Sequence, residues 1–264
     1  MCILFVALNA HPHYPLIICA NRDEFHHRPT APAHIWPPEQ NILAGKDLQA
    51  GGTWFGVNKQ GQVAGVTNLR MPQKHPEAMR SRGELITKAL SSGSLICPNW
   101  LAEHCDDYQP FNLVFGQGTD LYCFNSIKRE TVKLADGFHA ISNGALDDIW
   151  PKMAKGQQAL ETLIKQASQL DVQALIQLMQ DDSLPLDSEL PNTGIGLEWE
   201  RRLAAIYIRH PDYGTRSTSI LLEDTLGAIH FTEVRFDGKG RRLGQQDFHF
   251  TLPTASVAPK RSQP

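Results

Sequence analysis

Residues 1–25 read MCILFVALNAHPHYPLIICANRDEF, and two short apolar runs within this stretch decide the fold. The runs, residues 2–8 and 16–20, are flanked by turn-forming residues, as is typical of strands. The connection NAHPHYP between them is typical of a hairpin loop. The stretch therefore predicts two antiparallel strands that are neighbours in one sheet, with Cys2 at the start of the first strand.

Further strand and helix patterns follow along the chain. Residues 53–69 indicate a second hairpin, in which Gly61 can adopt the positive φ of a tight turn. Prolines interrupt residues 26–41, which predicts an irregular loop. Helical patterns cover residues 77–90, 98–104, 152–180 with a break near 170–171, and 197–208. The remaining strand patterns are residues 112–116, 121–125, 131–134, 138–142, 217–222, 228–234 and 247–252.

The order of these elements is strands, helix, strands, helices, strands. Antiparallel hairpins with helices in blocks are typical of layered α+β proteins, whereas a parallel doubly wound sheet needs strands that alternate with helices. No internal repeat divides the chain. We therefore expect a single domain over residues 1–252, with both of its ends in a common sheet, and a flexible tail over residues 253–264.

The composition excludes several classes of protein. The chain has 264 residues, 41% hydrophobic content and a net charge of −3, so it has no basic excess for binding nucleic acid. No apolar run approaches the roughly 20 residues of a membrane span, and the N-terminus lacks the basic segment of a signal peptide. The five cysteines form no CxxC pair, which predicts free thiols, no metal site and a cytoplasmic location.

Cys2 permits two interpretations. Free cysteines are usually buried and inert, and by itself Cys2 is typical of a small core residue in an edge strand. If Met1 is removed, Cys2 instead carries a free α-amine with a pKa of about 7.7–8, which suits a general base near neutral pH. One residue would then supply both the thiol and the base, as in an N-terminal nucleophile.

The polar segment Asn-Arg-Asp-Glu, residues 21–24, follows an apolar strand and requires partners if it is buried. Asp23 could accept a hydrogen bond from the α-amine of Cys2. Arg22 or Arg28 could supply positive charge that favours a thiolate or binds an anionic ligand. A charged turn with internal ion pairs is the alternative.

Several segments occur in a recognisable order: MCI, ANRDEF, GGTWFGVNKQGQVAGVTNLR, SRGEL, FNLVFG, ISNGALDDIWPK, LPNTGIGLEWERRL and YGTRSTSILL. They run from residue 1 to about residue 222, and together they resemble the NRDE family, also called the transport and Golgi organization protein family. That family in turn resembles the cysteine-type N-terminal-nucleophile hydrolases, which include bile-salt hydrolases and penicillin V acylases. The resemblance implies a four-layer αββα sandwich of mainly antiparallel sheets.

The resemblance also implies catalytic roles. Cys2 matches the nucleophile, and Asp23 matches the aspartate that holds the α-amine. Asn68 matches an asparagine of the oxyanion hole, where neutral donors stabilise a tetrahedral intermediate. Asn143 matches a second asparagine near the nucleophile. Arg216 matches the arginine beneath the thiol, where a guanidinium lowers the pKa of the thiol.

The chain departs from these hydrolases at one position. They carry an arginine directly before the Asn-x-Asp, where this chain has Ala20. Arg22 lies two residues further along. The period of a strand places its side chain on the opposite face from Asn21 and Asp23.

Two functions follow from the resemblance. The NRDE family is associated with cytosolic haem binding and trafficking and with acyl-CoA and lipid homeostasis, which implies a carrier of haem or a similar amphipathic ligand. The alternative is a Cys2-dependent hydrolase of linear C–N amides that requires no cofactor. A third alternative is an inactive fold retained for protein contacts, although no residue identifies a protein partner. The candidate ligand-binding residues are Asn21, Arg22, Glu24, Arg28, Trp54 and Lys152.

Overall fold

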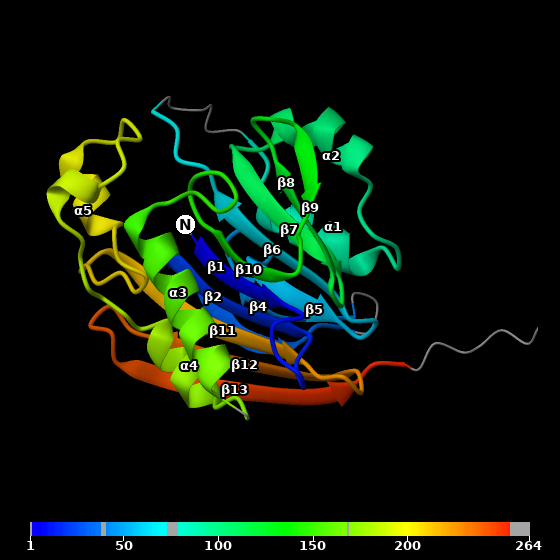
Figure 1. The fold of residues 1–264 in the computed structure, drawn as a ribbon. Coiled ribbons are helices and arrows are strands. Elements are labelled where there is room, and N and C mark those ends of the chain that lie inside the picture. The colour runs from blue at the N-terminus through cyan, green and yellow to red at the C-terminus, as the bar shows by residue number, and fades with distance from the viewer. Residues whose placement is uncertain (1, 38–40, 73–78, 168, 254–264) are drawn as a thin grey trace, which may run out of the picture.

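Four layers make up the protein in the computed structural model, which describes residues 2–37, 41–72, 79–167 and 169–253. Two antiparallel sheets pack face to face in the middle, and helices cover the outer face of each sheet (Figure 1). The predicted α+β class and αββα sandwich are therefore confirmed. The predicted tail lies outside the described residues except for Pro253.

The first sheet contains both the start and the end of the described chain. β1 (Cys2–Leu8) and β2 (Leu16–Phe25) are antiparallel neighbours, as predicted. β2 continues through the Asn-Arg-Asp-Glu segment, which therefore lies on a strand and not in a turn. Across the sheet the order is β10 (Gly137–Ile141), β1, β2, β11 (Tyr213–Glu223), β12 (Ala228–Phe236) and β13 (Arg242–Thr251).

The second sheet is a meander in which each strand pairs with the next one along the chain. The hairpin predicted at residues 53–69 consists of β5 (Phe55–Asn58) and β6 (Gln62–Asn68), and Gly61 in its turn has a φ of +83°. The strands are β3 (Thr30–Ile35), β4 (Ile42–Asp47), β5 (Phe55–Asn58), β6 (Gln62–Asn68), β7 (Phe111–Gln117), β8 (Asp120–Asn125) and β9 (Glu130–Lys133).

β3 shows that the loop predicted for residues 26–41 is wrong in part. The strand pairs with β4, but the register shifts between Ala31 and His34, on either side of Pro32. β3 is the edge strand of its sheet, and an edge strand tolerates proline because one side of its backbone has no neighbour to bond. The prolines therefore indicated the irregular pairing but concealed the strand.

The helices lie outside the two sheets. They are α1 (Gly83–Ser91), α2 (Pro98–His104), α3 (Pro151–Gln166), α4 (Val172–Leu178) and α5 (Leu197–Arg202). The predicted break near residues 170–171 separates α3 from α4, and the Asp171 side chain caps α4 by accepting a hydrogen bond from the Gln173 N–H. α1 begins later and α5 ends earlier than the sequence patterns indicated. Within the described residues, no helix has the length and apolar character needed to cross a membrane.

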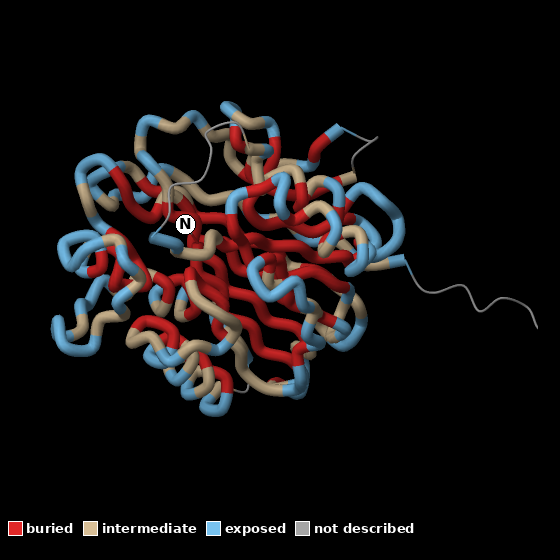
Figure 2. The backbone as a smooth tube through the Cα atoms, turned by 90° about the horizontal axis from the view of Figure 1, so that it is seen from above, coloured by how far each residue is buried: buried red, intermediate tan, exposed pale blue. Residues whose placement is uncertain are grey.

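Three apolar layers hold the four structural layers together. Figure 2 shows that the strands in the middle of the protein are mostly buried, whereas the exposed residues lie mainly at its edge. β1 contributes to two of them, since every one of its residues is buried. Leu4 and Val6 pack between the sheets, whereas Ile3 and Phe5 pack against α3 and α4. The third apolar layer lies between the second sheet and the helices α1 and α2. A strand buried on both faces is a continuous apolar run, which explains why β1 shows no polar alternation.

A buried carboxylate links the two sheets. Glu233 on β12 is 1% exposed, and its Oε1 accepts a hydrogen bond from the Ala33 N–H on β3 at 2.7 Å. Its second oxygen has no hydrogen-bond partner among the described residues. Burial raises the pKa of Glu233 to about 7, against the opposing effects of the Ala33 N–H and of the Arg235 and Arg22 guanidinium groups.

We expect Glu233 to make the protein less stable as the pH rises. Because its pKa is raised above the ordinary value of 4.5, the folded state holds this proton more tightly than the unfolded state. The stabilisation is fully present below pH 4.5 and is lost as the pH rises to about 7, which amounts to about 3 kcal/mol. Denaturant unfolding of the protein and of Glu233→Gln across this range measures the effect. If the free energy of unfolding changed with pH in the same way in both proteins, Glu233 would not be the source of the effect.

Candidate active site

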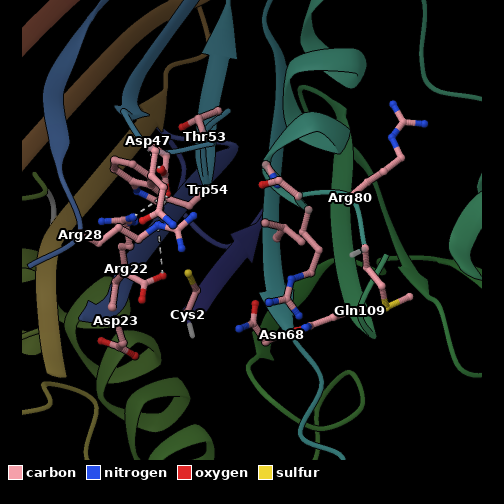
Figure 3. A pocket seen from close by; sticks show the side chains of 17 residues that line it. Cys2, Arg22, Asp23, Arg28, Asp47, Thr53, Trp54, Asn68, Arg80 and Gln109 are labelled. Carbon is pink, nitrogen blue, oxygen red and sulfur yellow. Dashed lines mark hydrogen bonds and ion pairs between the residues drawn. The ribbon is translucent and has the colours of Figure 1, made fainter. Parts of the chain in front are cut away.

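A cavity of about 380 Å³ opens where β1 begins and β6 ends, between the two sheets (Figure 3). The first sheet contributes β1 and β2 to its wall, the second sheet contributes β6, and the start of α1 completes it. Of the residues predicted for the site, the wall contains Cys2, Arg22, Asp23, Glu24, Arg28, Trp54 and Asn68. In the described part of the chain, no cluster of three or more His, Cys, Asp or Glu side chains could hold a metal ion.

Arg22 lies on the same face of the sheet as Cys2. The two residues are directly opposite each other in the β1–β2 pairing, so both side chains face the cavity. Arg22 is held in place by Asp47, which accepts a hydrogen bond at 3.1 Å, and by the Thr30 hydroxyl at 3.0 Å. Its guanidinium carbon also lies 4.3 Å from the ring centre of Trp54. The site therefore presents a fixed positive charge to the thiol.

Asn21 and Asp23 face the opposite side of β2, as the strand period predicted. The Asn21 amide donates to the carbonyls of Met179 and Ile206 at 2.8 and 2.9 Å, which ties β2 to the helical layer. Asp23 accepts a hydrogen bond from the Thr215 hydroxyl at 2.7 Å. Asp23 nevertheless lines the cavity, because it lies beyond the first residue of β1. Asn21 does not line the cavity and has a structural role here.

The surroundings of Cys2 favour the protonated thiol. Burial raises its pKa and the Asp23 carboxylate raises it further, whereas the Arg22 guanidinium lowers it. Burial also raises the pKa of Asp23, against the charge of Lys152 and the hydrogen bond from Thr215. A nucleophile at this position therefore needs a base beside the thiol to accept its proton.

Asn68 faces Cys2 from the second sheet, across the cavity from Arg22 (Figure 3). The Asn143 amide donates to the Asn68 carbonyl at 3.0 Å, and the Asn143 Oδ1 accepts from the Lys152 Nζ at 3.4 Å. Asn143 is not among the described residues that line the cavity. It therefore acts on the site by fixing the backbone at Asn68.

Arg216 lies apart from the thiol. The pairing of β11 with β2 shifts register between Thr215 and Ser217, so Arg216 is the extra residue of a bulge. Its Nη1 donates to the carbonyls of Phe25 and Arg28 at 2.8 and 3.1 Å. The structure thus places Arg22, and not Arg216, as the guanidinium beside the thiol.

Lys152 belongs to a buried cluster beneath the cavity, and does not line the cavity itself. Its Nζ donates to the Leu203 carbonyl at 3.1 Å. Burial lowers the pKa of Lys152 to about 7, and the charge of Arg70 lowers it in the same direction. Arg70 in turn pairs with Glu200 at 2.7 Å, and both side chains are only 4% exposed. The sequence analysis assigned no role to Arg70 or Glu200, although both lie in the segments that carry the family resemblance.

Asp47 and Arg82 are among the cavity residues that were not predicted. Asp47 accepts hydrogen bonds from both Arg22 and Arg28, which are 25 and 19 residues away. No local pattern indicates such a contact between strands of different sheets. Arg82 lines the cavity from the residue before α1. Its segment, SRGEL, was part of the resemblance but carried no role.

Comparisons of the sequence with known proteins agree on one family. The profile of the family Transport and Golgi organisation 2 matches residues 1–238. The chain is 34% identical to the Transport and Golgi organization protein 2 homolog of Bos taurus, over 88% of this chain and 92% of that one. It is 32% identical to the Mus musculus homolog, over 96% and 99% of the two chains. Among solved structures, a mutant of the conjugated bile acid hydrolase of Clostridium perfringens has a similar fold, with a TM-score of 0.50, 9% identity and coverage of 98% and 100%.

Proposed function

The chain belongs to the Transport and Golgi organisation 2 family, and from this premise we propose that it hydrolyses C–N amide bonds with Cys2 as an N-terminal nucleophile. The observation that carries the proposal is the position of the Cys2 thiol at a cavity that also contains Arg22, Asp23 and Asn68. The shared fold with a bile acid hydrolase supports the same reaction class.

The proposed first half-reaction forms a thioester. Once Met1 is removed, the α-amine of Cys2 accepts the thiol proton, and the thiolate attacks the carbonyl carbon to form a C–S bond. The carbonyl oxygen becomes an oxyanion, which the side-chain amide of Asn68 stabilises. The intermediate then collapses, the C–N bond breaks, and the leaving amine takes the proton from the α-ammonium group.

The proposed second half-reaction releases the acyl group. Water attacks the thioester carbon and gives its proton to the α-amine. The C–S bond breaks, the released thiolate takes the proton from the α-ammonium group, and a carboxylic acid leaves. Asp23 orients the α-amine in both halves, and Arg22 stabilises the thiolate.

Intact-mass measurement tests this proposal, because the mechanism requires that Met1 is removed and the mass of the protein reports whether it is. We expect a mature protein that begins at Cys2 and that gains the mass of an acyl group on exposure to an activated acyl donor. Peptide mapping should place the acyl group on Cys2. Retention of Met1 on all molecules would block the α-amine and contradict the mechanism.

Haem binding is the second candidate. A cysteine thiolate can serve as an axial ligand of haem iron, and the guanidinium groups around Cys2 could pair with the propionates. The mostly polar wall of the cavity favours the hydrolase, because a haem macrocycle needs extensive apolar contact. Titration with haemin followed by absorbance separates the two candidates. Saturable binding that Cys2→Ala abolishes would favour the haem carrier.

We also propose that the protein works in the cytoplasm. All of its cysteines are free thiols, and Cys97 is exposed. Free thiols persist in a reducing compartment. Fractionation of cells that express the chain tests this location.

A further inference from the structure

We infer that the cavity beside Cys2 accepts substrates that carry an anionic group, such as a carboxylate, sulfonate or phosphate, and that Arg82 binds this group. The inference rests on the proposed function, because it names the substrate class of the same site. It depends on which charges in the cavity already have partners and which do not.

Arg82 differs from the neighbouring arginines in its partners. Its Nη1 donates to the Pro110 carbonyl at 3.2 Å, and no carboxylate of the described residues pairs with it. Arg22 and Arg28, by contrast, both pair with Asp47, at 3.1 and 2.6 Å. Within the described residues, Arg82 is thus a guanidinium at the cavity wall that forms no ion pair.

The acidic groups of the cavity are engaged elsewhere. Glu24 accepts a hydrogen bond from the Phe25 N–H at 2.8 Å and lies 3.9 Å from the Arg28 Nε. Asp47 is occupied by its two arginines, and Asp23 accepts from the Thr215 hydroxyl on the far face of β2. Among the described residues, none of these carboxylates forms an ion pair with Arg82, and Glu24 acts on it only through its nearby charge.

The backbone fixes Arg82 at this place. The Gly83 carbonyl accepts a hydrogen bond from the Thr53 N–H at 3.4 Å. A Cβ atom on Gly52 would come within 2.5 Å of the Gly83 carbonyl carbon, so the two backbones touch where no side chain fits. This contact holds the start of α1 against the segment that leads to Trp54. It also explains why glycines occur in both GGTW and SRGEL.

The electrostatics favour a bound anion. Burial lowers the pKa of Arg82, whereas the nearby Cys2 and Glu24 raise it. A partly buried guanidinium loses hydration that its single carbonyl contact does not replace. A carboxylate or phosphate would restore that interaction with two parallel hydrogen bonds.

Alkylation of Cys2 tests the inference without any substrate. Iodoacetate and iodoacetamide have similar size and place the same carbon on sulfur, but only iodoacetate is anionic. We expect the ratio of the iodoacetate rate to the iodoacetamide rate to be about tenfold higher at Cys2 than at the exposed Cys97, which serves as an internal reference. Peptide mass spectrometry measures both sites in one sample. Equal ratios at the two cysteines, or no alkylation of Cys2 by either reagent, would overturn the inference.

Two variants locate the effect. Arg82→Gln should lower the ratio at Cys2 about tenfold, to the value at Cys97. Arg80→Gln is the matched control, because Arg80 also lines the cavity but is 54% exposed and pairs with Glu84 at 2.8 Å. An unchanged ratio in Arg82→Gln, or an equal loss in Arg80→Gln, would contradict the assignment to Arg82.

A measurement on the unaltered protein covers the case in which Arg82→Gln fails to fold. Inorganic phosphate should slow iodoacetate at Cys2 more than sodium chloride of the same ionic strength, and should not do so at Cys97. Equal effects of the two salts would count against an anion site. The alkylation readout needs no turnover. A protein that hydrolyses amides without this preference would refute the inference alone, and a protein with the preference but without turnover would refute the proposed function alone.

Discussion

Replacing Cys2 by alanine should abolish amide turnover while leaving the protein folded. The variant removes the atom that forms the thioester, and loss of a nucleophile typically lowers kcat by roughly 10³-fold or more. Cys2 is the first residue of β1 and borders the open cavity, so removing its sulfur enlarges that cavity and creates no closed void. Turnover of an acyl-amide panel and thermal unfolding measure the two effects. Turnover by Cys2→Ala at the wild-type rate would exclude Cys2 as the nucleophile.

Two other cysteines provide matched controls for this substitution. Cys97→Ala removes an exposed thiol and should change neither turnover nor stability. Cys19→Ala removes a thiol that packs against the helical layer, where burial raises its pKa to about 12. That variant should be less stable by about 1 kcal/mol but should retain turnover. A loss of turnover in all three variants would point to a general effect on folding.

Replacing Glu200 by alanine should lower the free energy of unfolding by about 3–5 kcal/mol, because it leaves a buried charge without its partner. Glu200 pairs with Arg70 at 2.7 Å, and its other oxygen accepts from the Thr193 N–H and hydroxyl at 2.8 and 2.6 Å. Arg70 would retain contacts with Asn143 and the Leu203 carbonyl but would lose its counter-charge. Denaturant unfolding measures the change.

A neighbouring pair on the same helix is the control. Glu198 pairs with Arg202, but the Glu198 side chain is 74% exposed. Glu198→Ala should therefore change the free energy of unfolding by no more than about 0.5 kcal/mol. The double variant Arg70→Met, Glu200→Leu should recover much of the loss, since it leaves no unpaired charge. Equal losses in Glu198→Ala and Glu200→Ala would contradict the account of burial.

The first hairpin and the layered fold could be predicted because their signals are local. Apolar runs, turn formers and the blocks of helical pattern each lie within a few residues of one another. β3 was missed because Pro32 carries an equally local signal for irregular structure, and only the edge position of the strand overrides it.

Which residues form the site could not be predicted fully from the sequence, because it depends on contacts between residues that are far apart in the chain. Strand alternation predicted that Arg22 and Asp23 face opposite sides, but only the observed register shows that Arg22 faces Cys2. The bulge at Arg216 moves that residue away from the thiol, and its position depends on how β11 pairs with β2. Asp47 reaches the cavity from β4 and Arg82 from the residue before α1, so their roles depend on how the second sheet and its helix pack against the first sheet.

The pairing of Cys2 with Arg22 also limits how the chain can change in length. β2 presents different side chains on its two faces. Inserting or deleting one residue between Cys19 and Arg22 would move the following side chains of β2 to the opposite face. Asn21 or Asp23 would then point toward the thiol, and the guanidinium would point toward the helices. A longer or shorter loop at residues 9–15 has no such consequence, because the ladder begins after it. Relatives of this protein should therefore vary in length at the hairpin loop and keep a constant count of residues along β2.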